Sequence, residues 1–167
     1  MVAPKRLSKE GVPAALKKAE RYRFLNEPWQ AESICRDVLE TEPDNAEATV
    51  LLLLAITDQF DHEPHTDVAC AQALLPRLAG DYQRAYYAGI ICERWAGRLL
   101  HLGAPGAGPI AYEWLRRAMA RYEEAERLRA PGDDDAILRW NTCARLIERN
   151  PHARPAPDEP EAPIELE

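Results

Sequence analysis

The regular spacing of helix-breaking residues is the feature that most restricts how this chain can fold. Proline, glycine and Asp/Asn clusters recur along the 167 residues and divide them into segments of helix length. Between the breaks alanine, leucine, arginine and glutamate dominate, whereas valine, threonine and phenylalanine are scarce. Straight-chain residues lose little rotamer freedom on a helix, so the sequence predicts an all-α fold.

The segments between the breaks predict seven helices, approximately over residues 13–26, 28–41, 46–59, 67–78, 82–101, 109–128 and 133–150. The apolar run 50–56 predicts that the third helix is buried on most sides, and Pro76 is expected to distort the end of the fourth. The glycine-rich segment 103–108 predicts a loop. The sixth segment has the clearest helical periodicity, at Ala111, Leu115, Ala118, Tyr122 and Ala125.

The length and composition suit one domain with its own core. An apolar fraction of 46% is that of a globular chain. We expect a flexible N-terminus over residues 1–11, a helical domain over 12–150, and a disordered tail over 151–167 that is rich in proline and glutamate.

The net charge of −7 argues against non-specific nucleic-acid binding, which needs a basic surface that displaces counterions. Much of the acidity is local, since five carboxylates lie in the last ten residues: Asp158, Glu159, Glu161, Glu165 and Glu167. The folded part is therefore expected to be only mildly acidic.

Nothing in the sequence points to export or to a membrane. The first residues lack the apolar core of a signal peptide, and the run 50–56 is too short to span a bilayer. The four cysteines (Cys35, Cys70, Cys92 and Cys143) are single and have apolar neighbours, which favours buried free thiols over disulfides. We therefore expect a cytoplasmic protein.

Three segments contain residue types that can carry chemistry, but each has a simpler interpretation. His62 and His65 straddle Pro64 without a second matching ligand cluster, so capping groups in a loop are favoured over a metal site. Cys92 and Cys143 lack a nearby histidine that would activate a thiolate. The segment 103–108 lacks the Gly-Lys-Ser/Thr ending of a phosphate-binding loop. We therefore predict no catalytic residue, metal or cofactor.

Aromatic residues gather in the C-terminal half of the sequence: Trp95, Trp114, Trp140, Tyr86, Tyr87 and Tyr112. Helical spacing places most of them against neighbouring helices, as core residues. One that stays partly exposed would be a candidate anchor for a binding partner.

Aligning Val12 with Ala46 reveals an internal offset of 34 residues. In the first unit Tyr22 is followed by Ala31, Val38 and Pro43, with a small residue early in the second helix and proline at the closing turn. In these residues the sequence resembles the tetratricopeptide repeat (TPR) family. A further unit that begins at Tyr82 has Ala88-Gly89 where the family usually has Leu-Gly.

The resemblance covers roughly residues 12–128. It implies a right-handed superhelix of antiparallel helix pairs, about three repeats plus a C-terminal capping helix, whose apolar faces are buried by stacking. It also implies that the first helix of each pair lines a concave groove. Carrying the family's groove positions onto this chain selects ten residues: Leu16, Glu20, Arg23, Val50, Leu54, Asp58, Tyr86, Ile90, Glu93 and Arg94.

The resemblance implies a non-enzymatic adaptor or scaffold that binds a protein partner, as a peptide or an amphipathic helix, in this groove. One alternative is a bacterial secretion-type chaperone that shields apolar segments of a client. A further alternative is that the chain's own helices cover Leu54 and Ile90. A separate hypothesis places the acidic tail, with Ile164 and Leu166, in the groove as an internal competitor. The sequence leaves the partner and the oligomeric state open.

Overall fold

The computed structural model describes residues 3–61 and 68–156, and these residues form seven α-helices and two short 3-10 helices without any strand. The all-α prediction is confirmed. The elements are η1 (Lys9–Gly11), α1 (Val12–Phe24), α2 (Pro28–Thr41), α3 (Ala46–Asp58), α4 (Val68–Gln72), η2 (Leu75–Arg77), α5 (Gly80–Leu102), α6 (Ala107–Leu128) and α7 (Asp135–Arg149).

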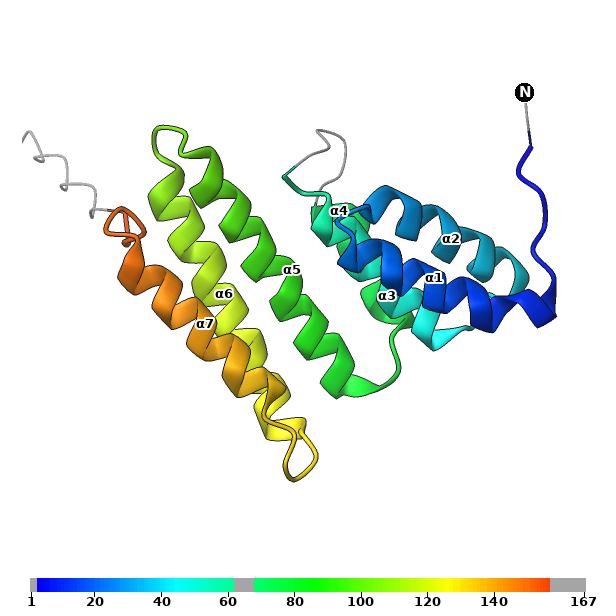
Figure 1. Ribbon diagram of the computed structural model, residues 1–167. Coiled ribbons are helices and arrows are strands. Elements are labelled where there is room, and N and C mark those ends of the chain that lie inside the picture. Colours follow the sequence, from blue (N-terminus) through cyan, green and yellow to red (C-terminus); the bar gives the residue numbers. More distant parts are fainter. Residues whose placement is uncertain (1–2, 62–67, 157–167) are drawn as a thin grey trace, which may run out of the picture.

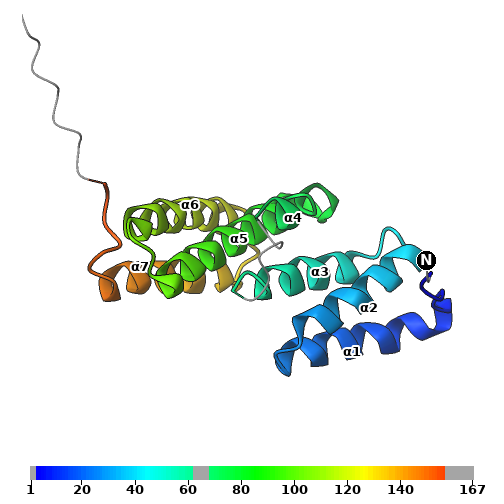
Figure 2. The same ribbon diagram turned by 90° about the horizontal axis from the view of Figure 1, so that it is seen from above.

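The helices are arranged in two groups that meet at α3 and α5. Helices α1, α2 and α3 pack on one another at one end of the molecule, and α5, α6 and α7 lie side by side at the other (Figure 1). Helix α3 contacts α4 and α5, and α4 also packs on α5. The chain therefore begins and ends at opposite ends of the molecule, as Figure 2 also shows.

Local chemistry explains where most helices begin and end. Pro28 opens α2, where a missing N–H costs nothing. The Asn45 side chain caps α3 by accepting a hydrogen bond of 2.9 Å from the N–H of Ala48. Gly103 ends α5 in the left-handed conformation, with φ of 58°. The boundaries expected from sequence agree with the structure within about two residues for these helices.

Two expectations about the connections need correction. The fourth helix is shorter than expected, because α4 ends at Gln72 and Pro76 lies in the separate 3-10 turn η2. The glycine-rich loop is also shorter: α6 already begins at Ala107, after Gly106 with φ of 80°. Pro109 fits in the first turn of α6 because an N–H is not needed there.

Two hydrophobic clusters form the core. The first lies among α1, α2, α3 and the α4–η2 segment, and the second lies among α5, α6 and α7. Leu54 and Tyr87 pack against both clusters and so connect them. As expected, α3 is buried on most sides, since Leu51, Leu52 and Leu53 are all in the core.

Parts of both predicted flexible ends pack on the helices. Leu7 contacts the first cluster, and its carbonyl accepts a hydrogen bond of 3.2 Å from the Thr41 hydroxyl. Ala153 is fully buried, and the His152 carbonyl lies so close to Gly108 that a β-carbon there would be 2.2 Å away. The packed part of the chain thus extends past residue 150, and residues 157–167 of the expected tail lie outside the described residues.

Within the described ranges, none of the helices has both the length and the apolar character that crossing a membrane requires. Cys35, Cys92 and Cys143 are buried, as expected, but Cys70 on the short helix α4 is exposed. The short helix α4 buries only Ala71, so Cys70 lies on its exposed side.

Candidate functional site

Charged side chains from α1, α3 and α5 meet at the carboxyl end of α3. The two oxygens of Asp58 are shared between two guanidinium groups: Oδ2 accepts from Arg23 Nε at 2.7 Å, and Oδ1 accepts from Arg94 Nη1. The three side chains retain 17–24% of their exposure, so they face a surface. We call these three residues the charged ladder, since they join successive odd-numbered helices.

Arg94 has the most contacts in the ladder. Its Nη1 also donates to the Thr57 hydroxyl at 2.6 Å and to the Leu54 carbonyl at 3.1 Å, which satisfies acceptors in the last turn of α3. Burial lowers the pKa of Arg94 below its usual value, and the Asp58 carboxylate opposes this effect. Because an arginine stays protonated in proteins, the guanidinium carries its charge at the end of α3, where the helix dipole favours a cation.

A second charged centre continues the ladder to α7. Glu93 is buried at 7% exposure, yet its carboxylate is fully engaged. The Tyr122 hydroxyl of α6 donates to Oε2 at 2.5 Å, and Arg139 Nη1 of α7 donates to Oε1 at 3.1 Å. Burial, and next the charge of Glu93, raise the pKa of Tyr122 far above its usual value, so the hydroxyl stays a donor.

Aromatic rings border this second centre. Tyr86 stacks on Tyr82 at 5.9 Å between ring centroids and meets Tyr87 edge-on at 5.2 Å. It also lies 5.9 Å from the ring of Tyr122. Because Tyr86 is only partly buried, it presents an aromatic surface next to the Glu93 centre.

An open hollow of about 330 Å³ lies beside the ladder, between the carboxyl end of α3, the middle of α5 and Leu146 of α7. Asp58, Glu93, Arg94 and Arg98 line part of it. Arg98 is held in place because it donates to the Phe60 carbonyl and lies 5.0 Å from the centre of the Trp95 ring. The hollow therefore has a polar rim with fixed side chains.

The ten residues selected from the sequence fall into three groups. Arg23, Asp58, Glu93 and Arg94 come together in the two charged centres, and Tyr86 lies beside the second. Glu20 is exposed on α1, and Val50 and Leu54 are partly buried. Leu16 and Ile90 are core residues with 6% and 1% exposure, so their side chains contribute packing and do not line the surface.

The interpretation of the sequence missed Arg139 and Tyr122 as members of the site. A signal was present for Arg139, which follows the buried Ala136 by three residues and precedes the buried Cys143 by four. That spacing puts a cation near the buried face of a helix, where it needs an acidic partner. The identity of the partner, Glu93, depends on how α5 and α7 pack.

Three of the four thiols are buried, and the two histidines that the sequence singled out are not described. Burial raises the pKa of the Cys35 and Cys143 thiols to about 12, and it also raises that of Cys92, so all three are protonated at neutral pH. His62 and His65 lie outside the described residues. Among the residues described, no group of three or more His, Cys, Asp or Glu side chains is placed to hold a metal ion.

Comparisons with protein-family models, with curated proteins and with solved structures find no match for this chain. The charged ladder and the Glu93 centre are accordingly the basis for the function proposed below.

Proposed function

We propose that the chain is a TPR-like protein-interaction module, a right-handed superhelix whose helices α1, α3, α5 and α7 form one binding face. In this proposal the face holds an extended peptide or an amphipathic helix of a partner protein. The observation that supports it most is a pair of ionic groups from neighbouring positions of α5: Arg94 shares Asp58 of α3 with Arg23 of α1, and Glu93 pairs with Arg139 of α7, so that charged contacts involve all four odd-numbered helices.

The chemistry of the ladder suits a polar peptide. Two guanidinium groups share the single carboxylate of Asp58, which leaves an excess of positive charge. Arg23 uses Nε alone for this contact, and no described residue accepts a hydrogen bond from its Nη1 or Nη2. A guanidinium fork with free donors can bind the carboxylate or the backbone carbonyls of a ligand. Tyr86 adds a ring against which an apolar side chain can pack.

The chaperone alternative has less support. Shielding apolar client segments calls for an apolar lining, but Leu16 and Ile90 are covered by the chain's own helices. The side chains that remain at the face are mainly charged or aromatic, which favours a partner with polar groups along its length.

The test measures how the loss of the Arg23 guanidinium affects binding. Peptides selected by display on the wild-type protein, and partners retained from native lysate, are measured by calorimetry against wild type and an Arg23→Gln variant. We expect Arg23→Gln to weaken binding about tenfold, as for the loss of one charge-assisted hydrogen bond. Asp58 keeps its contact with Arg94 in this variant, so the fold is expected to persist.

Arg36→Gln is the matched control. Arg36 also pairs with an acidic residue, Glu32 at 2.6 Å, but it lies on α2, outside the proposed face. We expect Arg36→Gln to bind like wild type. Equal affinity of the wild-type and Arg23→Gln proteins for every selected ligand, or the recovery of no ligand at all, would sink the assignment of this face.

A further inference from the structure

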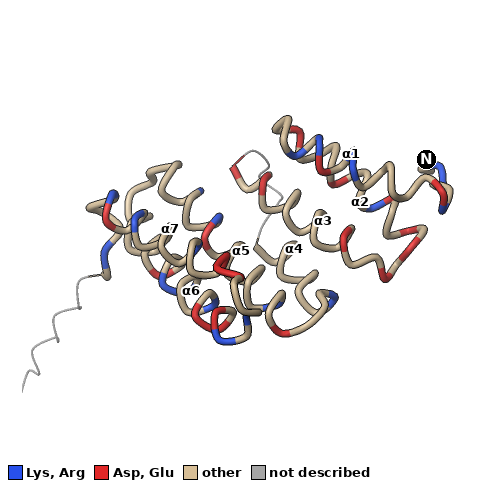
Figure 3. The backbone as a smooth tube through the Cα atoms, turned by 60° about the horizontal axis from the view of Figure 1, so that its bottom comes forward, with Lys and Arg blue, Asp and Glu red and all other residues tan. Residues whose placement is uncertain are grey.

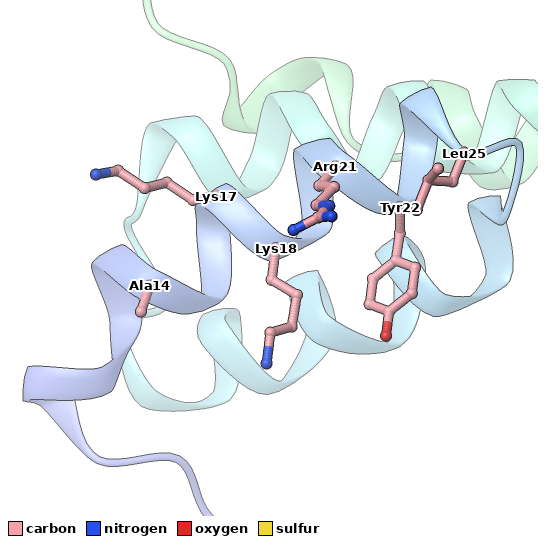
Figure 4. Close-up of a pocket in the computed structure, with 6 residues that line it drawn as sticks. All are labelled: Ala14, Lys17, Lys18, Arg21, Tyr22 and Leu25. Carbon is pink, nitrogen blue, oxygen red and sulfur yellow. The ribbon is translucent and has the colours of Figure 1, made fainter.

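The outer face of α1 forms a basic hollow that lies apart from the charged ladder. Its volume is about 420 Å³, and its six lining residues all belong to the α1 segment: Ala14, Lys17, Lys18, Arg21, Tyr22 and Leu25 (Figure 4). Lys17, Lys18 and Arg21 all project from α1 in this view, with Lys17 and Lys18 pointing in different directions. Ala14, Tyr22 and Leu25 add apolar surface between and beside the cations.

The three cations form no ion pair with a carboxylate of the described residues. Some exposed arginines on other helices do have such a partner, since Arg36 pairs with Glu32, Arg84 with Asp81 and Arg121 with Glu124. Within the same described ranges, Arg116, Arg117 and Arg127 of α6 have none, so it is the apolar surroundings of the α1 cations that set them apart. Figure 3 shows basic and acidic positions along α1, and the side chains of Lys17, Lys18 and Arg21 are exposed.

Exposed apolar side chains adjoin this basic surface. Phe24, Leu25 and Trp29, at the turn between α1 and α2, are 81%, 57% and 51% exposed. Single exposed apolar residues are common, but three large ones around one turn, next to unpaired cations, are typical of an interaction surface. A helix face that served only to keep the molecule in solution would not need them.

The chain contains a segment with the complementary chemistry. Residues 157–167 carry five carboxylates, no lysine or arginine, and the apolar residues Ile164 and Leu166. The carboxylates of this segment can form ion pairs with Lys17, Lys18 and Arg21. Its aliphatic side chains can pack on Tyr22 and Leu25.

The positions of the two surfaces favour binding between molecules. Helix α1 and the end of the described chain after α7 lie at opposite ends of the molecule (Figures 1 and 2). A fully extended segment of eleven residues spans at most about 40 Å, and to reach α1 of its own molecule it would have to run back past both helix groups. The same segment of a second copy faces no such limit.

We propose that residues 157–167 of one copy bind across the outer face of α1 of a second copy, so that the chains associate head to tail. Such a contact is heterologous, because the two molecules contribute different surfaces, and it leaves one free α1 face and one free acidic segment at the ends of every assembly that does not close into a ring. This proposal does not depend on the binding face formed by the odd-numbered helices.

Sedimentation analysis of the full chain over a range of concentrations tests the proposal. We expect reversible association beyond the dimer, and we expect it to weaken when salt rises from about 0.1 to 1 M, because the Debye length falls from about 10 to 3 Å. An α1 variant (Lys17→Glu, Lys18→Glu, Arg21→Glu) and a tail variant (Glu159→Gln, Glu161→Gln, Glu165→Gln) each remove one of the two surfaces. Each is expected to weaken association at least about tenfold. The α1 variant places like charges opposite the acidic segment, and the tail variant removes carboxylates that would pair with the α1 cations.

Mixing the two variants provides the sharpest test. The α1 variant retains its acidic segment, and the tail variant retains its α1 face, so the mixture is expected to form heterodimers that cannot grow further. A charge-matched control on α6 (Arg116→Glu, Arg117→Glu, Arg127→Glu) changes three exposed arginines and is expected to associate like wild type. A wild-type protein that is monomeric at all concentrations, or a mixture without heterodimers, would overturn the proposal. Equal weakening by the α6 control would do so too.

Discussion

A single glycine, Gly89, allows the packing of the C-terminal core to be tested directly. Gly89 of α5 faces the ring of Tyr122, and a β-carbon at this position would lie 2.5–2.9 Å from three ring atoms. The ring has little freedom to move away, since Tyr122 is fully buried and its hydroxyl is bonded to Glu93. The small residue is thus required by the approach of α6 to α5.

We expect Gly89→Ala to lower the free energy of unfolding by about 1–3 kcal/mol, as overpacking does in a filled core. Gly97, on the same helix, is the matched control because its added β-carbon would meet no atom within 4 Å. Gly97→Ala should raise the free energy of unfolding by about 0.5–1 kcal/mol through helix propensity. Urea denaturation measures both values, and a Gly89→Ala variant as stable as wild type would contradict the packing described.

At the scale of the element, α3 is the central helix of the N-terminal group. It packs on α1 and α2 and also contacts α4 and α5. Its amino end depends on Asn45, whose side chain accepts from Ala48 and donates to Glu42 at 2.8 Å. Its carboxyl end depends on Arg94, which reaches over from α5. The amino end of α3 is thus stabilised by a residue next to it in the sequence, and the carboxyl end by a residue of α5, about 40 positions further along the chain.

Asn45→Ala removes the cap of α3 and is expected to lower the free energy of unfolding by about 1 kcal/mol. Glu27 at the start of α2 is a suitable comparison, since it has the same position but forms no side-chain cap. We expect Glu27→Ala to change the free energy of unfolding by less than about 0.5 kcal/mol. Thermal and urea denaturation distinguish the two variants, and equal effects would show that the cap contributes nothing.

At the scale of the whole molecule, the contact between the two helix groups is small compared with the packing inside each group. Leu54 and Tyr87 connect the clusters, and Arg94 adds hydrogen bonds between α5 and α3. The α5–α7 group also contains the two longest helices, with 23 and 22 residues. The two groups are therefore expected to differ in local stability.

We expect Arg94→Gln to lower the free energy of unfolding by about 1–3 kcal/mol, because it removes hydrogen bonds made by a charged group. Hydrogen exchange read by mass spectrometry should show a larger loss of protection in α1–α3 than in α5–α7. Arg121→Gln is the control, since Arg121 is more exposed and pairs only with Glu124 on its own helix. Uniform loss of protection over all helices in the Arg94→Gln variant would contradict this coupling.

The sequence by itself determined the helices and most of their ends. Pro28, Asn45 and Gly103 act within about four residues of their own positions, so their effects can be derived without knowledge of the fold. The burial of α3 can also be derived from the sequence, because a helix that is apolar on most sides is stable in water only when other elements cover it. The interpretation of the sequence placed the end of the fourth helix six residues too late, near Pro76, and the start of the sixth two residues too late, after Gly106.

Only the tertiary structure decided which side chains share a surface. Glu93 and Arg139 are 46 residues apart, and Arg23 and Asp58 are 35 apart. Nothing local in the sequence specifies these pairs, because they arise from the angles at which whole helices pack. The same packing buried Leu16 and Ile90, which the resemblance to the repeat family had placed in the groove, and left Phe24 and Trp29 exposed. Helix formation is a local property of this chain, whereas the composition of its surfaces depends on contacts between residues distant in sequence.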